Sequence, residues 1–269
     1  VLNQQDINKF LWILVGVSTM LMILGYINYE EISSYRGGRM TVMGGGPIVF
    51  GRWMLIAVLV ILFNKNTYSR YLYLLIPLFL FMSFTAGSRG PLYAFVVILL
   101  LYFLFSFRRN FIKIIILSLL GIASITTLSL TENDKGAGSQ STSRIFNTSI
   151  GAYARIDRVI RSVKLVTAAP FGVGIGNWAQ ESNKFSEHQH EDKQYSHNIF
   201  FELMNESGIV VLLLFVILLI TILDSSLLLL SLQDHYFRLF LILFVYLFIN
   251  ALVSGDIVDN RLMFIMLAL

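Results

Sequence analysis

The chain has 269 residues, of which 56% are hydrophobic and 13% are charged, and its formal net charge is +4. Soluble domains carry about 25% charged residues, so a chain with a mean hydropathy of +0.73 is expected to face lipid over much of its surface. It contains no cysteine, which excludes disulfides, thiolate metal sites and cysteine nucleophiles.

The apolar runs predict an all-α, polytopic membrane protein. A spanning helix needs about 20 mainly apolar residues. Such runs occur near residues 10–27, 48–63, 71–86, 91–107, 112–130, 207–223, 237–253 and 262–269. The chain begins with Val1 and stops within an apolar run, so we expect residues 1–269 to be a single transmembrane domain of a longer protein.

The connections between these runs alternate in charge. One set is short and carries the basic residues Lys9, Lys65, Arg70, Arg108, Arg109, Lys113, His235 and Arg238. The positive-inside rule places this set on the cytoplasmic side. The outer side then receives residues 28–46, 85–90, 131–197 and 254–261. The stretch 131–197 is far longer than a connection requires, and such loops usually have a function or a fold of their own.

An amphipathic helix is predicted inside the long loop. In "YARIDRVIRSVKLVTAAP", the apolar residues recur at helical spacing from Ile156 to Val166, and Pro170 ends the pattern. The basic residues on its polar side are Arg155, Arg158, Arg161 and Lys164. Two interpretations stay open: an interfacial helix with its basic face toward anionic headgroups, or a helix whose arginines grip a phosphate.

Two further motifs of the loop could suggest a nucleotide or a metal site, and we predict neither. The glycines of "FGVGIGNW" (171–178) follow a helix and a proline rather than a strand, so we predict a tight turn and not a nucleotide loop. In "EHQHEDKQYSHN" (187–198), His188 and His190 lie among carboxylates. The zinc-protease pattern H-E-x-x-H fails because Gln194 stands where its second histidine belongs. We therefore expect a solvated loop and no metal.

Several cationic residues from distant parts of the chain share the outer side. Arg52 lies inside an apolar run, where a charge either faces a cavity or partner or snorkels to the headgroups. His197 precedes Asn198 at a helix start. There it either exchanges protons near neutral pH or is an interfacial histidine without a chemical role. With Arg89 and Arg155, these residues suggest a phosphate-bearing lipid as the ligand, because the arginine fork suits phosphate oxygens.

The chain resembles the bacterial O-antigen polymerase and ligase superfamily over about residues 36 to 261. Each motif is weak alone, and their order and spacing carry the resemblance. The motifs are "RGGRMTVMGGGPIVFGRW" (36–53), "TAGSRGPLYAF" (85–95), "ARIDRVIRSVKLVTAAPFGVGIGNW" (154–178) and "HNIFFELMNESGIVVLLL" (197–214).

The resemblance implies a glycosyltransferase-C-like membrane protein whose periplasmic loop, residues 131–197, is catalytic. It implies that Arg89 and Arg155 bind a lipid diphosphate and that His197 is a general base or a diphosphate contact. Four residues after Arg155, Val159 stands where the family often has tryptophan. The further substrate-binding residues that we expect are Arg39, Arg52, Arg158 and Asn198.

The function implied by the resemblance is polymerisation of undecaprenyl-pyrophosphate-linked repeat units at the periplasmic side of the bacterial inner membrane. This glycosyl transfer would need no metal, cofactor or nucleic acid, and its partners would be the lipid bilayer and a chain-length regulator protein. One alternative is an O-antigen ligase that transfers the glycan to lipid A-core. The second is a membrane transporter, for which the sequence shows no inverted repeat.

Overall fold

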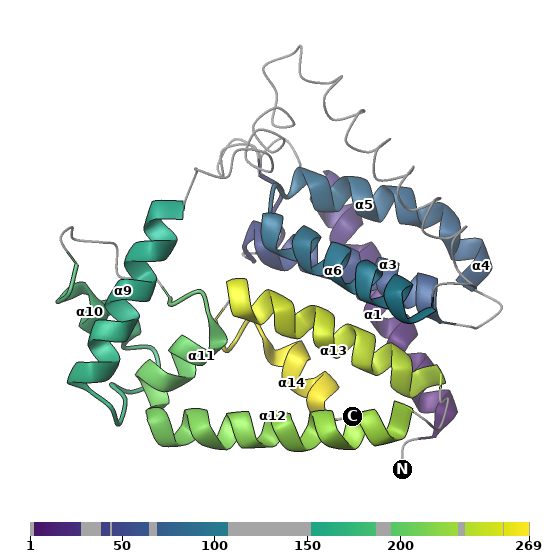
Figure 1. Cartoon of the computed structure of the whole chain (residues 1–269). Coiled ribbons are helices and arrows are strands. Elements are labelled where there is room, and N and C mark those ends of the chain that lie inside the picture. The colour runs from purple at the N-terminus through teal and green to yellow at the C-terminus, as the bar shows by residue number, and fades with distance from the viewer. Residues whose placement is uncertain are drawn as a thin grey trace. The chain divides into compact units, whose positions relative to one another are not determined.

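The computed structural model describes residues 3–27, 39–43, 45–64, 69–106, 152–186, 195–230, 235–254 and 256–268. All regular elements in these ranges are helical, and no strand occurs among them (Figure 1). The prediction of an all-α protein is therefore confirmed. The apolar run at 112–130 and the loop segments 131–151 and 187–194 lie outside the described residues.

The chain divides into two compact units. The first comprises Val1–Asn147 and Arg238–Tyr246, and the second comprises Thr148–Phe237 and Leu247–Leu269. Helix α13 (His235–Val253) contributes residues to both.

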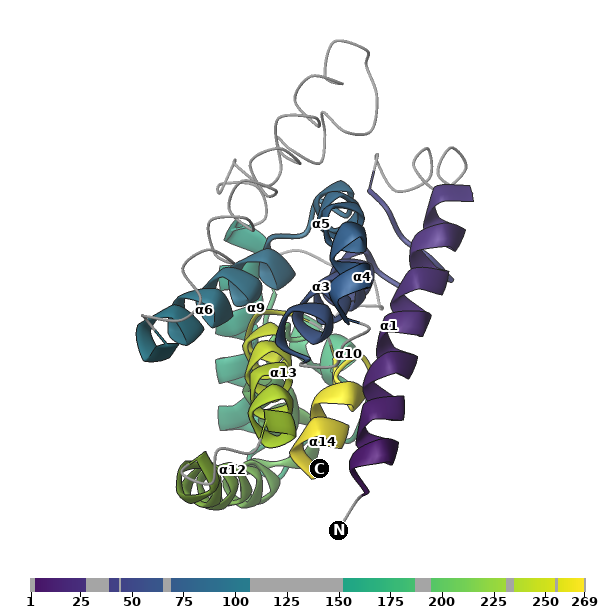
Figure 2. The same ribbon diagram turned by 90° about the vertical axis from the view of Figure 1, so that its right-hand side faces the viewer.

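The first unit is built around α3. Its helices are α1 (Gln4–Ile27), α3 (Pro47–Phe63), α4 (Ser69–Leu72), η1 (Tyr73–Leu75), α5 (Ile76–Thr85) and α6 (Arg89–Ser106). Proline opens α3, where its missing N–H costs no helical bond. α3 is apolar all round and packs against α1, α5 and α6 (Figure 2). Such a helix is expected in the interior of its unit.

A short extended segment holds the turn between α5 and α6. The backbone N–H of Met40 donates to the carbonyl of Thr85 at 3.2 Å. The Arg39 guanidinium donates from Nε to the Ala86 carbonyl at 3.2 Å and from Nη2 to the Gly87 carbonyl at 3.5 Å. The turn ends at Arg89, the first residue of α6, so these bonds fix the backbone that presents Arg89.

The second unit contains the end of the long loop and the helices that follow it. These are α9 (Ala152–Ala168), α10 (Trp178–Asn183), α11 (Ile199–Glu202), the π-helical turn η3 (Leu203–Ser207), α12 (Ile209–Leu230) and α14 (Arg261–Ala268). α9 stops two residues before Pro170, as predicted. Positive φ angles at Gly172, Gly174 and Gly176 confirm the tight-turn interpretation of the glycine motif.

Two helices are long and apolar enough to cross a membrane among the described residues, α1 and α13. Shorter apolar helices cover Pro47–Phe63, Tyr73–Thr85, Arg89–Tyr102 and Ile209–Ser225. Length and composition alone do not separate a spanning helix from the buried core helix of a soluble protein. The multi-pass topology and the outer-side loop therefore stay predictions.

Candidate functional site

His197 lies directly before the cap of α11. The Asn198 side chain accepts the N–H groups of Phe200 and Phe201 at 2.9 and 3.3 Å, which is the usual role of a helix N-cap. Its Nδ2 also donates to the Leu252 carbonyl at 2.9 Å. His197 itself has a φ of 59°, a conformation that non-glycine residues hold only where their surroundings impose it. The cap and the bond to the end of α13 therefore fix the backbone that carries the imidazole.

The surroundings of His197 keep its imidazole neutral. The ring of Tyr195 lies 4.1 Å from it between centroids. Burial, followed by the positive charges of Arg158 and Arg155, lowers the pKa of His197 from 6.5 to about 4. A neutral imidazole has a free nitrogen lone pair at physiological pH. His197 can therefore accept a proton, and it adds no positive charge next to the arginines.

Arg158 is the arginine of α9 that acts most strongly on His197. Burial, then repulsion from Arg161, lowers the pKa of Arg158. Its buried Nε has no hydrogen-bond partner in the part of the chain that the structure describes. Arg155 is exposed. A half-buried guanidinium with an unused donor is under-compensated, and a bound anion would supply the missing contact.

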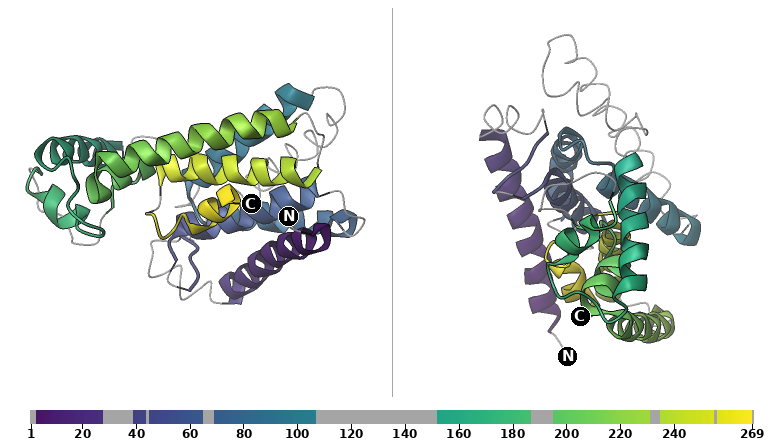
Figure 3. Two further views of the ribbon diagram at one scale, coloured as in Figure 1. Left: turned by 90° about the horizontal axis from the view of Figure 1, so that it is seen from below. Right: turned by 90° about the vertical axis from the view of Figure 1, so that its left-hand side faces the viewer.

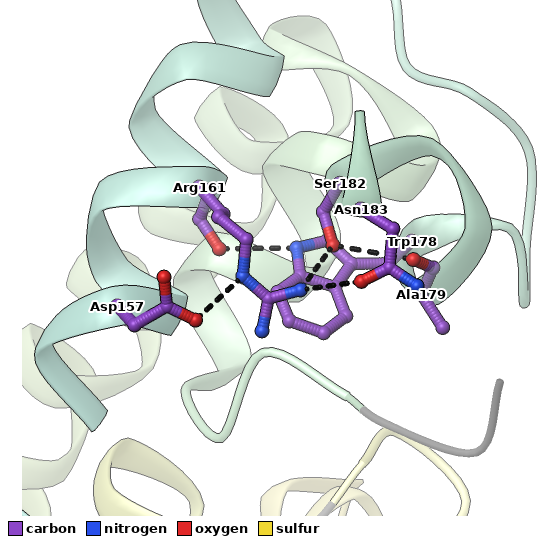
Figure 4. Close-up of polar contacts among 7 residues, drawn as sticks. Asp157, Arg161, Trp178, Ala179, Ser182 and Asn183 are labelled. Atoms are coloured by element: carbon purple, nitrogen blue, oxygen red, sulfur yellow. Dashed lines mark hydrogen bonds and ion pairs between the residues drawn. The ribbon is translucent and has the colours of Figure 1, made fainter. Parts of the chain in front are cut away.

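Arg161 has a structural role, which corrects its predicted place among the basic residues that face headgroups or a phosphate. Its side chain is 1% exposed, and its Nε pairs with Asp157 Oδ2 at 2.9 Å. Its Nη1 donates to Ser182 Oγ at 3.3 Å and to Asn183 Oδ1 at 2.9 Å. The guanidinium carbon lies 5.2 Å from the ring centroid of Trp178 (Figure 4). Arg161 therefore joins α9 to α10 and is not available to a ligand.

We expect Arg161→Lys to lower the free energy of unfolding by about 2 kcal/mol. Lysine cannot bond Asp157 and α10 at once, so at least one buried charged hydrogen bond is lost. Thermal unfolding of the purified protein in detergent measures the change. Lys164→Arg is the matched control, because Lys164 is exposed on the same helix and should change the stability by less than about 0.5 kcal/mol. Equal unfolding temperatures for both variants would contradict the joining role of Arg161.

Acidic residues lie near the His197 segment as well. Glu202 is 4% exposed, and its Oε1 accepts the N–H of Ile257 at 2.9 Å. Burial, and to a lesser extent the charges of Glu206, Asp256 and Asp259, raises the pKa of Glu202 to about 8 against the lowering effect of that hydrogen bond. Its carboxyl is therefore mainly protonated at neutral pH.

The turn at 256–259 also acts on the neighbour of His197. Burial, followed by the negative charge of Asp259, raises the pKa of Tyr195. Both the arginines of α9 and the carboxylates of this turn therefore act on the segment that carries His197.

The raised pKa of Glu202 predicts a stability that depends on pH. The folded state holds the proton of Glu202 up to about pH 8, whereas the unfolded state releases it near 4.5. The free energy of unfolding should therefore fall as the pH rises from 4.5 to about 8. Glu202→Gln cannot ionise, so its thermal unfolding temperature should fall less over this range than that of the wild type.

The measurement is sharpest above pH 6.5. The depressed pKa of His197 has the opposite effect, because it removes stability as the pH falls from 6.5 to about 4. Above pH 6.5, His197 no longer changes the free energy of unfolding, and only the contribution of Glu202 still varies with pH. Glu181→Gln, a change of a partly exposed carboxylate on α10, is the control and should keep the wild-type slope. A Glu202→Gln slope equal to the wild-type slope would exclude a buried, protonated Glu202.

The structure assigns the predicted site residues to both units. Arg155, Arg158, His197 and Asn198 belong to the second unit, where the charges of both arginines act on His197. Arg39, Arg52 and Arg89 belong to the first. Arg52 is only 3% exposed, so its side chain does not snorkel outward from the unit. The roles of all these residues toward a substrate stay predictions.

Tyr195 and Glu202 are not among the site residues predicted from the sequence. Tyr195 lies two residues before His197, and Glu202 lies four residues after Asn198. Both are close in sequence to the predicted helix start, and this closeness could have identified them. The approach of Asp256 and Asp259 had no sequence signal, because they come more than 50 positions later in the numbering. Within the described ranges, no three His, Cys, Asp or Glu residues are grouped to hold a metal; the loop with His188 and His190 lies outside them.

Comparison with known proteins identifies a family. No curated protein and no solved structure matches the chain. The family described as O-antigen ligase matches residues 72–216, a segment that includes Arg89, α9 and His197. This family covers polymerase and ligase functions on lipid-linked glycans in membranes, and its members are glycosyltransferase-like enzymes; the match gives no support to a transporter. Because the match covers more than half of its residues, the chain belongs to the O-antigen ligase family.

Proposed function

We propose that this protein polymerises polyprenyl-diphosphate-linked oligosaccharide repeat units at the periplasmic face of the bacterial inner membrane. The observation that carries the proposal is the environment of His197, a neutral imidazole with the charges of Arg158 and Arg155 acting on it. His197 can accept a proton, and Arg158 and Arg155 can stabilise a departing diphosphate. Glycosyl transfer from a lipid diphosphate needs both.

The reaction that we propose is a direct displacement. A hydroxyl oxygen of the acceptor sugar forms a bond to the anomeric carbon of the donor. The bond from that carbon to the diphosphate oxygen breaks, and its electron pair stays on the diphosphate. His197 takes the hydroxyl proton. The lipid diphosphate already activates the sugar, so the reaction needs no nucleotide. In this proposal arginines, and not a metal ion, stabilise the departing diphosphate, and the direct displacement inverts the anomeric configuration.

Substrate binding would prepare His197 for this step. The positive charges of Arg158 and Arg155 contribute to its low pKa. A diphosphate on these arginines offsets their charge, so the pKa of His197 rises toward the range where an imidazole is an effective base. Only the neutral imidazole is present before the donor binds. The donor would thus activate the base that uses it.

Arg89 is proposed as a further diphosphate ligand, with Arg39, Arg52 and Asn198 in supporting roles. Its support is the resemblance of "GSRG" to the family motif and its place at the start of α6. The Arg39 bonds to the preceding turn give it a positioning role for Arg89. Asn198 positions His197 through the cap of α11.

The glycine-rich segment "GGGPIVFGR" favours the polymerase over the ligase. A polymerase transfers the growing glycan to another lipid-linked repeat unit, and we propose a chain-length regulator as its partner. A ligase uses the same donor and transfers the glycan to lipid A-core. The two therefore differ in the acceptor and not in the proposed chemistry of His197.

An acceptor assay tests the proposal. The purified protein in proteoliposomes receives lipid-linked repeat units alone, or repeat units together with lipid A-core. We expect a ladder of polymers in both samples. Glycan attached to lipid A-core with no ladder would assign the ligase function, and transport of an unchanged donor would refute glycosyl transfer.

Arg158→Ala tests the diphosphate contact in the same assay. We expect a loss of kcat/KM of about 100-fold or more, which is typical when a charged group that stabilises a leaving group is removed. Arg238→Ala removes an exposed arginine from α13 and should leave the rate unchanged. A wild-type rate for Arg158→Ala and for Arg155→Ala would exclude the arginines of α9 from the reaction.

A further inference from the structure

α9 exposes an apolar stripe along its length. The exposed fractions are 59% for Ile156, 42% for Val159, 48% for Ile160 and 49% for Val163. These residues follow the i, i+3, i+4, i+7 spacing that places side chains on one face of a helix. A soluble protein normally buries such a face.

The opposite face of α9 is already in use. Arg161, Ser162 and Leu165 are each at most 2% exposed. Ser162 Oγ accepts from Trp178 Nε1 at 3.0 Å, and Leu165 packs with Trp178 and Ala179 of α10. The helix is therefore held in its unit by a largely polar face, and it presents its apolar face outward. This is the reverse of the usual arrangement.

Two cations flank the apolar stripe. Successive residues of an α-helix are about 100° apart, which places Arg155 on one side of the stripe and Lys164 on the other. Both side chains are exposed. Long basic side chains beside an apolar face are typical of helices that lie at a membrane surface, because their charged ends reach the phosphate headgroups.

The loop after α9 is fastened to the start of α12. The Pro170 carbonyl accepts the N–H of Ile209 at 3.0 Å. The N–H groups of Val173 and Gly174 donate to the carbonyls of Asn205 and Glu206, both at 2.9 Å. These bonds keep the C-terminal end of α9 at the N-terminal end of α12.

Exposed apolar residues also occur in this loop and on α12. Phe171 is 84% exposed and Ile175 is 82% exposed. Along α12, the residues with more than half of their surface exposed include Val210, Leu213, Leu214 and Ile217. α9 runs across the N-terminal end of α12 and not along it (Figures 1 and 3). If α12 spans the membrane, α9 has the direction of a helix lying in the membrane plane.

We propose that α9 lies in the outer interface of an anionic phospholipid bilayer, with the stripe of Ile156, Val159, Ile160 and Val163 immersed among the acyl chains. The proposal rests on α12 as a membrane span and not on the chemistry of His197. α9 also carries Arg158, so its depth in the interface sets the height of the candidate site above the acyl chains. A donor anchored by a prenyl chain presents its diphosphate at this level.

Site-directed spin labelling tests the proposal. The chain has no native cysteine, so each single-cysteine variant carries one label. Val159→Cys and Ile160→Cys are labelled in proteoliposomes of phosphatidylethanolamine and phosphatidylglycerol, and collisions with oxygen and with a water-soluble nickel chelate are compared. Leu213→Cys on α12 is the lipid-facing control, and Lys184→Cys after α10 is the aqueous control.

We expect the α9 labels to behave as Leu213→Cys does, with frequent collisions with oxygen and rare collisions with the chelate. Vesicles of phosphatidylcholine alone should reduce this contrast, because the headgroups then offer no net charge to Lys164 and Arg155. Labels that collide with the chelate as Lys184→Cys does would overturn the proposal. Exclusion from both reagents would also overturn it, since a protein partner or a second copy would then cover the stripe. The labels report position and not turnover, so this outcome is independent of the glycan assay.

Discussion

Replacing His197 by alanine is expected to lower kcat by about 100- to 10,000-fold, the range typical of a lost general base. KM should change little, because the diphosphate contacts come from arginines. His197→Gln should be as slow as His197→Ala, since the glutamine amide can form hydrogen bonds but cannot take up the proton of the acceptor hydroxyl. Initial rates of polymer formation from lipid-linked repeat units measure both effects.

The pH dependence separates a base from a structural histidine. The pKa of about 4 for His197 predicts that kcat/KM of the wild type falls as the pH drops through about 4, because the protonated imidazole accepts nothing. The residual activity of His197→Gln should lack this acid limb. His235→Ala, at the start of α13, is the control and should keep the wild-type rate. A His197→Gln variant that retains the acid limb would assign it to another group.

Gly208→Ala is expected to lower the free energy of unfolding by about 2–6 kcal/mol. Gly208 has a φ of +88°, and a Cβ there would lie 2.6 Å from the carbonyl carbon and oxygen of Phe171. With a ψ of 167°, this is a conformation that essentially only glycine adopts, which costs an alanine about 1–3 kcal/mol, and overpacking adds about 1–3 kcal/mol. Gly172→Ala should have a similar effect, because its Cβ would meet the Glu206 carbonyl oxygen at 2.6 Å. Chemical or thermal unfolding in detergent measures both.

Gly176→Ala is the matched control for these two variants. Gly176 also has a positive φ, of +82°, but no atom lies within 4 Å of its Cβ position. It should therefore show the conformational cost alone, about 1–2 kcal/mol. A Gly208→Ala variant no less stable than Gly176→Ala would show that the backbone of residues 171–174 is not packed tightly against η3.

Local sequence signals predicted the helices of the candidate site well. The sequence predicts that Pro170 ends α9 and that a helix starts at His197 and Asn198, and the structure shows Asn198 as the N-cap of α11. A proline and an N-cap asparagine act within one helical turn of their own position. The positive φ angles in the "FGVGIG" turn follow from the lack of a Cβ in glycine. Such effects depend on neighbours in sequence, so one sequence is enough to predict them.

The partners of each charged side chain could not be predicted from the sequence. Arg161 has the same spacing in the basic pattern as its neighbours, yet α10 covers it and leaves Arg155 exposed. The difference comes from Trp178 and Asn183, which contact Arg161. They do so because the turn after α9 brings α10 back against it. The protonation of Glu202 likewise depends on Ile257 and the acids Asp256 and Asp259 beside it. These residues come more than 50 positions later in the sequence, after both α12 and α13. Which basic residue faces a ligand is therefore a tertiary property.

If α12 spans the membrane, the hydrogen bonds that join residues 170–174 to η3 and to the start of α12 couple the candidate site to the thickness of the bilayer. A spanning helix responds to hydrophobic mismatch by tilting, and a tilt of α12 would move the attached end of α9, and Arg158 with it, relative to the headgroups. We therefore expect turnover to pass through an optimum as the acyl chains of the host lipid are lengthened. Proteoliposomes that differ only in chain length would reveal it, and a flat profile would show that α9 keeps its height independently of α12.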